Sequence, residues 1–141
     1  MSVLPQGKYA RCANGYRMHY LDEGAGPVVV FLHGSGPGAS GYSNFKGNFP
    51  YLVERGYRCI VPDHIGYGFS DKPADVEYPL SFFTECIRQT LDAAGVARCS
   101  LVGNSLGGAI ALQFALDYPE MTEKLVLMAP GGLNAKEEYF Q

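Results

Sequence analysis

Short apolar runs alternate along this chain with longer stretches in which apolar residues recur at helical spacing. The apolar runs predict four strands of the buried, parallel kind, at 28–32, 58–62, 99–102 and 124–128. The stretches at helical spacing predict three helices, at 49–55, 81–94 and 106–116. Because strands and helices take turns along the chain, the pattern predicts an α/β fold whose mostly parallel sheet carries helices on both faces.

The N-terminal part follows a different pattern, in which apolar and polar residues alternate. The segments 8–13 and 16–22 both alternate in this way, and Asn14 and Gly15 between them form a pair typical of tight hairpin turns. We therefore expect an antiparallel hairpin to open the sheet.

Length and composition are those of one globular domain, and we expect residues 1–141 to form it. Apolar residues make up 47% of the chain and charged residues 18%, as in soluble proteins. The net charge of −3 provides no basic patch, so we expect neither a nucleic acid nor an anionic membrane as partner. No apolar stretch reaches the roughly 18 residues that a membrane-spanning helix needs, and the N-terminus lacks the features of a secretion signal.

The cysteines are scattered along the chain without a Cys-x-x-Cys pair, at Cys12, Cys59, Cys86 and Cys99. Such spacing favours free thiols in a reducing cytoplasm over disulfides or a metal site. We therefore expect a cytoplasmic protein without a bound metal.

Residues 101–108 read Leu-Val-Gly-Asn-Ser-Leu-Gly-Gly and contain the pattern Gly-x-Ser-x-Gly, centred on Ser105. A strand is expected to enter this run and a helix to leave it, which is the context of a nucleophile elbow. In such an elbow a strained turn lifts the serine Oγ above the sheet. Gly103 and Gly107 fit this interpretation, because a Cβ at either position would collide with the neighbouring strand or helix. An ordinary glycine-rich turn could show the same pattern, so a second motif is needed.

The second motif spans residues 33–38, which read His-Gly-Ser-Gly-Pro-Gly and directly follow the apolar run at 27–32. A glycine-rich turn at this point leaves backbone N–H groups that can point at one spot. Together with the N–H of the residue after the nucleophile, they can form an oxyanion hole. We predict that the donors are the backbone N–H groups of Ser35 and Leu106.

These motifs and three further stretches resemble the N-terminal half of an α/β-hydrolase, over essentially the whole chain. The matching stretches are 33–40, 42–45, 62–73, 101–109 and 127–132. More narrowly, Asn104 before Ser105, Gly-Pro-Gly at 36–38 and Pro-Gly-Gly at 130–132 resemble the meta-cleavage product hydrolases. Members of that family are serine hydrolases that split a carbon–carbon bond in vinylogous 1,5-diketones, the 2-hydroxy-6-oxo-dienoates formed by fission of aromatic rings.

The resemblance implies roles for individual residues. Ser105 would be the catalytic nucleophile, and Ser35 and Leu106 would provide the oxyanion hole. The residues expected to contact the small-molecule substrate are Gly34, Gly36, Asn44 and Asn104. Ser35 stands where related sequences often have glycine, and its side chain could narrow or polarise the pocket. The resemblance implies neither a metal nor an organic cofactor.

After Ser105 the chain departs from the family's pattern. The triad order in this fold is Ser, then Asp or Glu, then His, yet none of the 36 residues after Ser105 is a histidine. We therefore expect a fold truncated after its sixth strand, without the lid and the last strands that would carry the acid and the base.

The histidines that the chain does contain lie before Ser105. His33, beside the predicted oxyanion hole, is the candidate for a surrogate base. His19 is expected to be hydrogen-bonded within its strand, and His64 to pack in a loop that its neighbour Asp63 caps.

The last predicted strand, 124–128, would form an apolar edge of the sheet with unpaired backbone groups. We expect this edge to bind a second copy of the chain, giving a homo-oligomer, or a complementing C-terminal fragment.

Three functions remain open. The first is a meta-cleavage product hydrolase with esterase side activity, and the second is a general carboxylesterase. The third is a catalytically inactive scaffold that assembles or binds small molecules, which the missing acid and base would explain.

Overall fold

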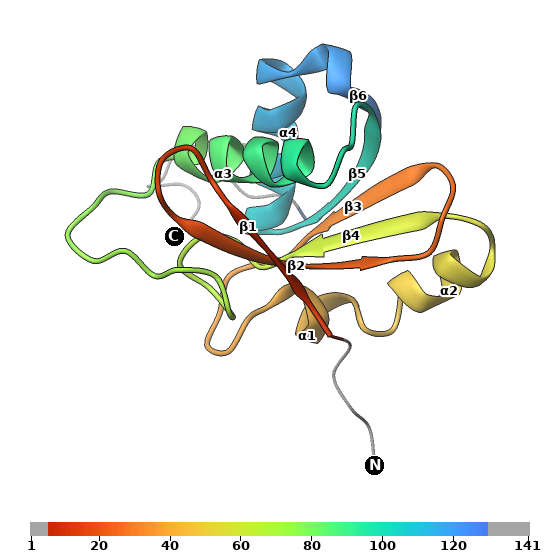
Figure 1. The fold of residues 1–141 in the computed structure, drawn as a ribbon, viewed down its shortest axis with the longest axis horizontal. Coiled ribbons are helices and arrows are strands. Elements are labelled where there is room, and N and C mark those ends of the chain that lie inside the picture. The colour runs from red at the N-terminus through yellow and green to blue at the C-terminus, as the bar shows by residue number, and fades with distance from the viewer. Residues whose placement is uncertain (1–5, 130–141) are drawn as a thin grey trace.

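A single six-stranded sheet organises the part of the chain that the computed structural model describes, residues 6–129. The strands are β1 (Lys8–Arg11), β2 (Arg17–Glu23), β3 (Val28–Leu32), β4 (Arg58–Pro62), β5 (Cys99–Asn104) and β6 (Thr122–Met128). The helices are α1 (Gly41–Phe45), α2 (Phe49–Glu54), α3 (Leu80–Ala93) and α4 (Leu106–Asp117), followed by the short 3-10 helix η1 (Pro119–Met121). Helices α3 and α4 lie on one face of the sheet and α1 and α2 on the other (Figure 1).

The order of the strands in the sheet is β1-β2-β4-β3-β5-β6. β2 pairs antiparallel with both β1 and β4, and the remaining pairs are parallel. The fold predicted from the alternating pattern, a parallel sheet opened by a hairpin, is confirmed. Leu32 at the end of β3 pairs with Gly103 near the end of β5, so the two loops that carry the sequence motifs leave the sheet side by side.

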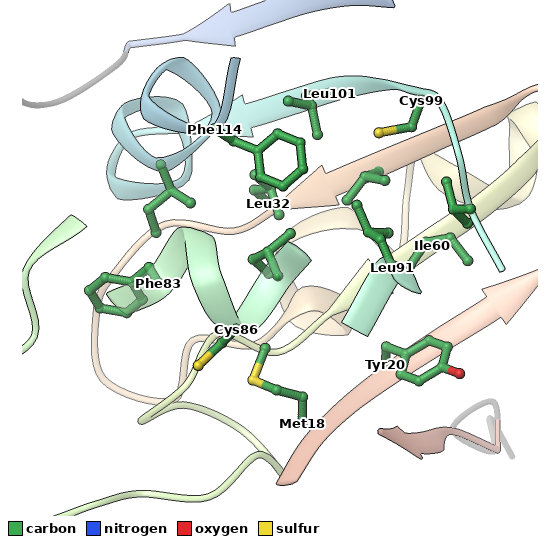
Figure 2. Packing of buried hydrophobic residues seen from close by; sticks show 14 of the residues in the cluster. Met18, Tyr20, Leu32, Ile60, Phe83, Cys86, Leu91, Cys99, Leu101 and Phe114 are labelled. Atoms are coloured by element: carbon green, nitrogen blue, oxygen red, sulfur yellow. The ribbon is translucent and has the colours of Figure 1, made fainter. Parts of the chain in front are cut away.

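Each face of the sheet has its own apolar core, because successive residues of a strand point to opposite faces. Along β3, Val30 and Leu32 enter the larger core while Val29 and Phe31 enter the smaller one. The larger core packs against α3 and α4, where Leu91 and Phe114 are fully buried (Figure 2). The smaller core packs against α1 and α2.

The helix α1 is a difference from the predicted elements, since residues 41–45 fall in a segment interpreted as a loop. Ser40 caps this helix: its Oγ accepts from the N–H of Ser43 at 3.0 Å, and the Ser43 Oγ accepts from the N–H of Ser40 at 2.9 Å. The capping box usually ends in Glu or Gln, and here the side chain of Ser43 accepts the hydrogen bond from the N-cap backbone in place of such a residue. The other helices begin and end within two residues of the predicted bounds.

The four cysteines are buried free thiols, as their spacing predicts. Burial raises the pKa of Cys59 to about 11 and that of Cys99 to about 12, so both stay protonated at neutral pH. No helix between residues 6 and 129 has the length and apolar character needed to cross a membrane.

An arginine–carboxylate pair joins three elements at the amino end of β4. The Nε and Nη2 atoms of Arg58 donate to the two carboxylate oxygens of Asp22 at 2.9 and 2.8 Å. Nη2 also donates to the carbonyl of Ala94, which follows α3, at 2.8 Å. The hydrogen bonds from Arg58 hold the pKa of Asp22 below its ordinary value of 3.8.

We expect R58A to lower the free energy of unfolding by about 2 kcal/mol at pH 7, because the largely buried Asp22 would keep only its longer contact with the exposed Lys8, at 3.4 Å. Since the folded pKa of Asp22 lies below its ordinary value, the pair stabilises fully above pH 3.8 and progressively less as the pH falls through the folded pKa. Urea unfolding at pH 7 and at decreasing pH values measures both effects. R98A, at an exposed arginine, is the control, and an equal loss in both variants would contradict the prediction.

Candidate active site

Ser105 occupies a strained turn between β5 and α4. Its φ of 55° and ψ of −113° lie in a region that residues with a side chain rarely adopt. The surrounding backbone holds it there: the Ser105 N–H donates to the Met128 carbonyl at 2.9 Å, and the Ser105 carbonyl accepts from the Gly108 N–H at 2.9 Å. This is the strand–turn–helix geometry of a nucleophile elbow.

The two glycines of the elbow are required by close packing, as the sequence predicts. A Cβ on Gly107 would lie 2.6 Å from the carbonyl oxygen of His33 and closer still to that of Leu32. A Cβ on Gly103 would lie 2.8 Å from the Cα of Gly108. The first turn of α4 therefore rests directly on the end of β3 and on β5.

The loop after β3 lies against the elbow. A Cβ on Gly34 would be 3.4 Å from the Cβ of Ser105, so Gly34 is an immediate neighbour of the serine. The Gly34 N–H is already used, because it donates to Oδ1 of Asn44 at 3.0 Å. Within residues 6–129, no acceptor engages the N–H groups of Ser35 and Leu106, the two predicted oxyanion donors. Leu106 is the first residue of α4, where a free N–H is normal.

The two asparagines predicted near the substrate contact each other. Oδ1 of Asn44, on α1, accepts from Nδ2 of Asn104 at 3.1 Å as well as from the Gly34 N–H. Asn44 thereby ties the loop after β3 to the residue that precedes Ser105. Gly36 lies further along the loop and lines a cleft of about 400 Å³, together with residues such as Gly66 and Lys72 from the loop after β4.

The arrangement of His33 argues against the hypothesis that it is a surrogate base. Its Nδ1 lies 2.7 Å from the Gly34 carbonyl oxygen, and its Nε2 accepts from the backbone N–H of His64 at 3.0 Å. The ring is fully buried, and burial lowers its pKa below the ordinary 6.5. Because both nitrogens are engaged by backbone groups, neither is left to take a proton from Ser105.

Asp63 caps the loops around the site, as its position predicts. Oδ1 accepts from the Gly41 N–H at 2.9 Å, and Oδ2 accepts from the Phe69 N–H at 2.9 Å and contacts Nδ1 of His19 at 3.0 Å. Burial works to raise the pKa of Asp63, but these hydrogen bonds outweigh it and hold the pKa below its ordinary value. The expected hydrogen bonding of His19 is confirmed.

His64 is the residue whose contribution the sequence does not reveal. Loop packing is the role predicted for it, and the ring is indeed fully buried. In addition, its Nε2 donates to the carbonyl oxygen of His33 at 2.9 Å, which brings it into the structure of the loop beside Ser105. Among residues 6–129, no three His, Cys, Asp or Glu side chains gather as metal ligands would.

We expect G107A to lower the free energy of unfolding by about 2–3 kcal/mol, because the added methyl group would overlap backbone carbonyl groups that cannot move without disturbing the sheet. G47A is the matched control, since no atom lies within 4 Å of the position its Cβ would take. Urea denaturation of the two variants gives the comparison. Equal stability of G107A and G47A would show that the elbow is not packed as described.

Comparison with known proteins agrees with this geometry. Residues 27–140 match the profile of the α/β hydrolase fold family. The chain is 46% identical over 122 residues to a 2-hydroxy-6-oxo-6-phenylhexa-2,4-dienoate hydrolase of Burkholderia cepacia, covering 86% of this chain and 43% of that protein. The chain spans about half the length of the curated relatives it matches.

Solved structures are similar over the same region. One is a meta-cleavage product hydrolase from Pseudomonas fluorescens complexed with acetates, with a TM-score of 0.86 and 37% identity, covering 92% of this chain and 47% of that one. Another is an esterase from Exiguobacterium antarcticum, with a TM-score of 0.83 and 29% identity, covering 95% of this chain and 50% of that one. With an elbow serine, a glycine-rich loop after β3 and a match over residues 27–140, the chain belongs to the α/β-hydrolase fold family.

Proposed function

We propose that this chain provides the nucleophile and the oxyanion hole of a meta-cleavage product hydrolase, which cleaves a carbon–carbon bond in 2-hydroxy-6-oxo-dienoates. The observation that carries the proposal is the strained Ser105, together with the N–H groups of Ser35 and Leu106, which have no partner among residues 6–129. The substrate class is supported by the names of relatives such as the Burkholderia cepacia hydrolase.

The proposed reaction begins when the dienol substrate loses its hydroxyl proton and takes up a proton on carbon, C5, and so becomes a ketone at C2. Ser105 Oγ then attacks the carbonyl carbon at C6 and loses its proton to a base. The N–H groups of Ser35 and Leu106 stabilise the oxyanion, helped by the positive end of α4. When the oxyanion collapses, the carbon–carbon bond between C5 and C6 breaks, and its electron pair leaves on a C5 carbanion that is conjugated through a double bond with the C2 ketone. The carbanion takes up a proton, and water hydrolyses the acyl-serine to the acid.

The base and the acid of this site come, in our proposal, from outside residues 6–129. Within that range the three histidines are His19, His33 and His64, and each is hydrogen-bonded elsewhere. We propose that a complementing C-terminal polypeptide supplies them by docking beside β6. A second copy of the chain can pair at the same edge, but its three histidines are engaged in the same way. The side chains of Val126 and Met128 on this strand are 52% and 40% exposed, and within residues 6–129 the strand is hydrogen-bonded on one side alone, to β5.

A general carboxylesterase is the second candidate, since the esterase from Exiguobacterium antarcticum shares the fold over the same region. The same serine and the same two N–H groups would serve an ester carbonyl equally well. The buried free thiols suit a reducing compartment, and we propose a cytoplasmic location on that ground.

Mixing the chain with the C-terminal half of the Burkholderia cepacia hydrolase should restore turnover of 2-hydroxy-6-oxo-6-phenylhexa-2,4-dienoate, followed by its absorbance. S105A should lower this rate by at least about 10³-fold, because the covalent step needs the Oγ. A faster reaction with a short acyl ester than with the dienoate would favour the carboxylesterase. Absence of any turnover that depends on Ser105 would favour the inactive scaffold.

The exposed edge should also govern assembly. We expect the chain alone to elute from gel filtration as an oligomer, and V126K to elute as a monomer that no longer complements, because a charge then faces the docking partner. V76K is the control, since Val76 is 41% exposed in a loop away from the edge. If V76K and V126K both keep the state of the parent chain, the docking site is not at β6.

A further inference from the structure

We propose that His33 and His64 form a positioning pair that aims the N–H of Ser35 at the oxyanion. The inference deepens the proposed function, on which it rests, because it concerns the oxyanion hole of the same site. It assigns no proton transfer to either ring. Each histidine side chain instead donates to a backbone carbonyl of the loop after β3, and the backbone N–H of His64 donates to the ring of His33.

The first step of the argument is the tautomer of His33. A backbone N–H can only donate, so the 3.0 Å contact from the His64 N–H requires an unprotonated Nε2 on His33. In a neutral imidazole the proton is then on Nδ1, which donates to the Gly34 carbonyl oxygen at 2.7 Å. The backbone N–H of His64, in the loop after β4, thus selects the His33 tautomer. In that tautomer Nδ1 carries the proton that binds the Gly34 carbonyl, in the loop after β3.

The second step concerns the peptide between Gly34 and Ser35. The carbonyl of Gly34 and the N–H of Ser35 belong to one planar trans unit, so they point in opposite directions. When His33 holds the carbonyl oxygen, it also sets the direction of the Ser35 N–H. That N–H, like the N–H of Leu106, has no acceptor among residues 6–129.

The peptide before it is held at both ends. Its carbonyl, from His33, accepts from Nε2 of His64 at 2.9 Å, and its N–H, from Gly34, donates to Oδ1 of Asn44 at 3.0 Å. Two consecutive peptide planes next to Ser105 are therefore fixed by the side chains of His33 itself, of Asn44 on α1 and of His64 in the loop after β4. A fixed donor is what an oxyanion hole requires, because the hole must be in place before the charge develops.

The third step concerns the free-energy cost of burying the His64 side chain. With Nε2 as a donor, its Nδ1 carries no proton, and this fully buried nitrogen has no hydrogen-bond partner among residues 6–129. Leucine would fill similar space without burying an unpartnered nitrogen. The hydrogen bond to the His33 carbonyl is the gain that offsets this cost.

The surroundings keep both rings neutral and in place. The ring centroids of His33 and His64 lie 4.2 Å apart, and Tyr67 and Phe83 pack edge-on against them at 5.3 and 5.8 Å. Burial, and then the neighbouring His33, lower the pKa of His64 well below 6.5, although the charge of Asp63 works in the opposite direction. A second proton on either ring would replace an acceptor nitrogen with a donor.

The tautomers can be measured directly by ¹⁵N NMR of the imidazoles in the parent chain at pH 6.5, the ordinary pKa of histidine. We expect a proton on Nδ1 alone in His33 and on Nε2 alone in His64, with neither ring partly charged. A His33 ring protonated on Nε2, or either ring half protonated at this pH, would overturn the proposal. This readout needs no turnover and no folded variant.

The contribution of the His64 side chain is tested with H64L and H64Q. Leucine has a similar size but no donor, whereas glutamine can place an N–H near the position of Nε2, and both keep the backbone N–H that sets the His33 tautomer. We expect the Gly34 amide to exchange about tenfold faster in H64L and near the parent rate in H64Q, which corresponds to one lost hydrogen bond. Equal exchange in H64L and the parent chain would overturn the proposal.

In the complemented enzyme, H64L should lower kcat more than it raises KM, and H64Q should restore kcat, because the donor acts on the developing oxyanion. A change in KM alone would contradict a role at the oxyanion. Failure of the parent complex to turn over substrate would count against the proposed function and leave the NMR test of the positioning pair intact.

Discussion

The contact between the first turn of α4 and the end of β3 is the constraint on which the rest of the structure depends. Only hydrogen at position 107 lets the helix backbone approach the carbonyls of Leu32 and His33 this closely. Because the helix cannot move away without breaking its packing on the sheet, the turn before it must be sharp. The positive φ of Ser105 is the result, and the serine is presented at the edge where the parallel strands end.

Around this contact, polar side chains provide hydrogen-bond partners for backbone N–H groups of the loops, which have no partners in a helix or a sheet. Asp63 joins β2, the start of α1 and the loop after β4, while Asn44 joins α1 to the loop after β3 and to the end of β5. Each of these side chains satisfies buried backbone N–H groups that would otherwise be left without partners. The loops around Ser105 are thus tied to the sheet and to one another by side-chain hydrogen bonds, which suits a site that must be organised before substrate arrives.

Most of the fold could be predicted from the sequence, because hydrophobic spacing reports directly on which residues are buried. The order of strands and helices, the hairpin and the buried glycines of the elbow all follow from local patterns that the structure confirms. The helix α1 escaped prediction because its capping box ends in Ser43 in place of an acidic residue. Short helices of this kind depend on a few side-chain contacts and leave almost no periodic signal.

The motifs of the candidate site could be predicted from the sequence, but the hydrogen bonds between its loops could not. The glycine-rich loop and Gly-x-Ser-x-Gly point to Ser35, Ser105 and Leu106, but no local pattern indicates that His33 and His64 are bonded to each other across 31 positions. The same limit explains why the sequence suggests His33 as a base. The sequence shows that His33 lies beside the predicted oxyanion hole, but it does not show that both ring nitrogens are hydrogen-bonded to backbone groups.

The hydrogen bond from the Ser105 N–H to the Met128 carbonyl links Ser105 to the last described strand. A polypeptide that pairs with β6 would stiffen this strand, and through one peptide group it would stiffen the turn that holds the serine. Thermodynamic linkage makes the effect reciprocal: a covalent adduct that favours one geometry of Ser105 would also change the affinity of β6 for its partner. One coupling free energy, between strand pairing at β6 and the geometry of Ser105, would then affect both the assembly and the reactivity of the proposed complex.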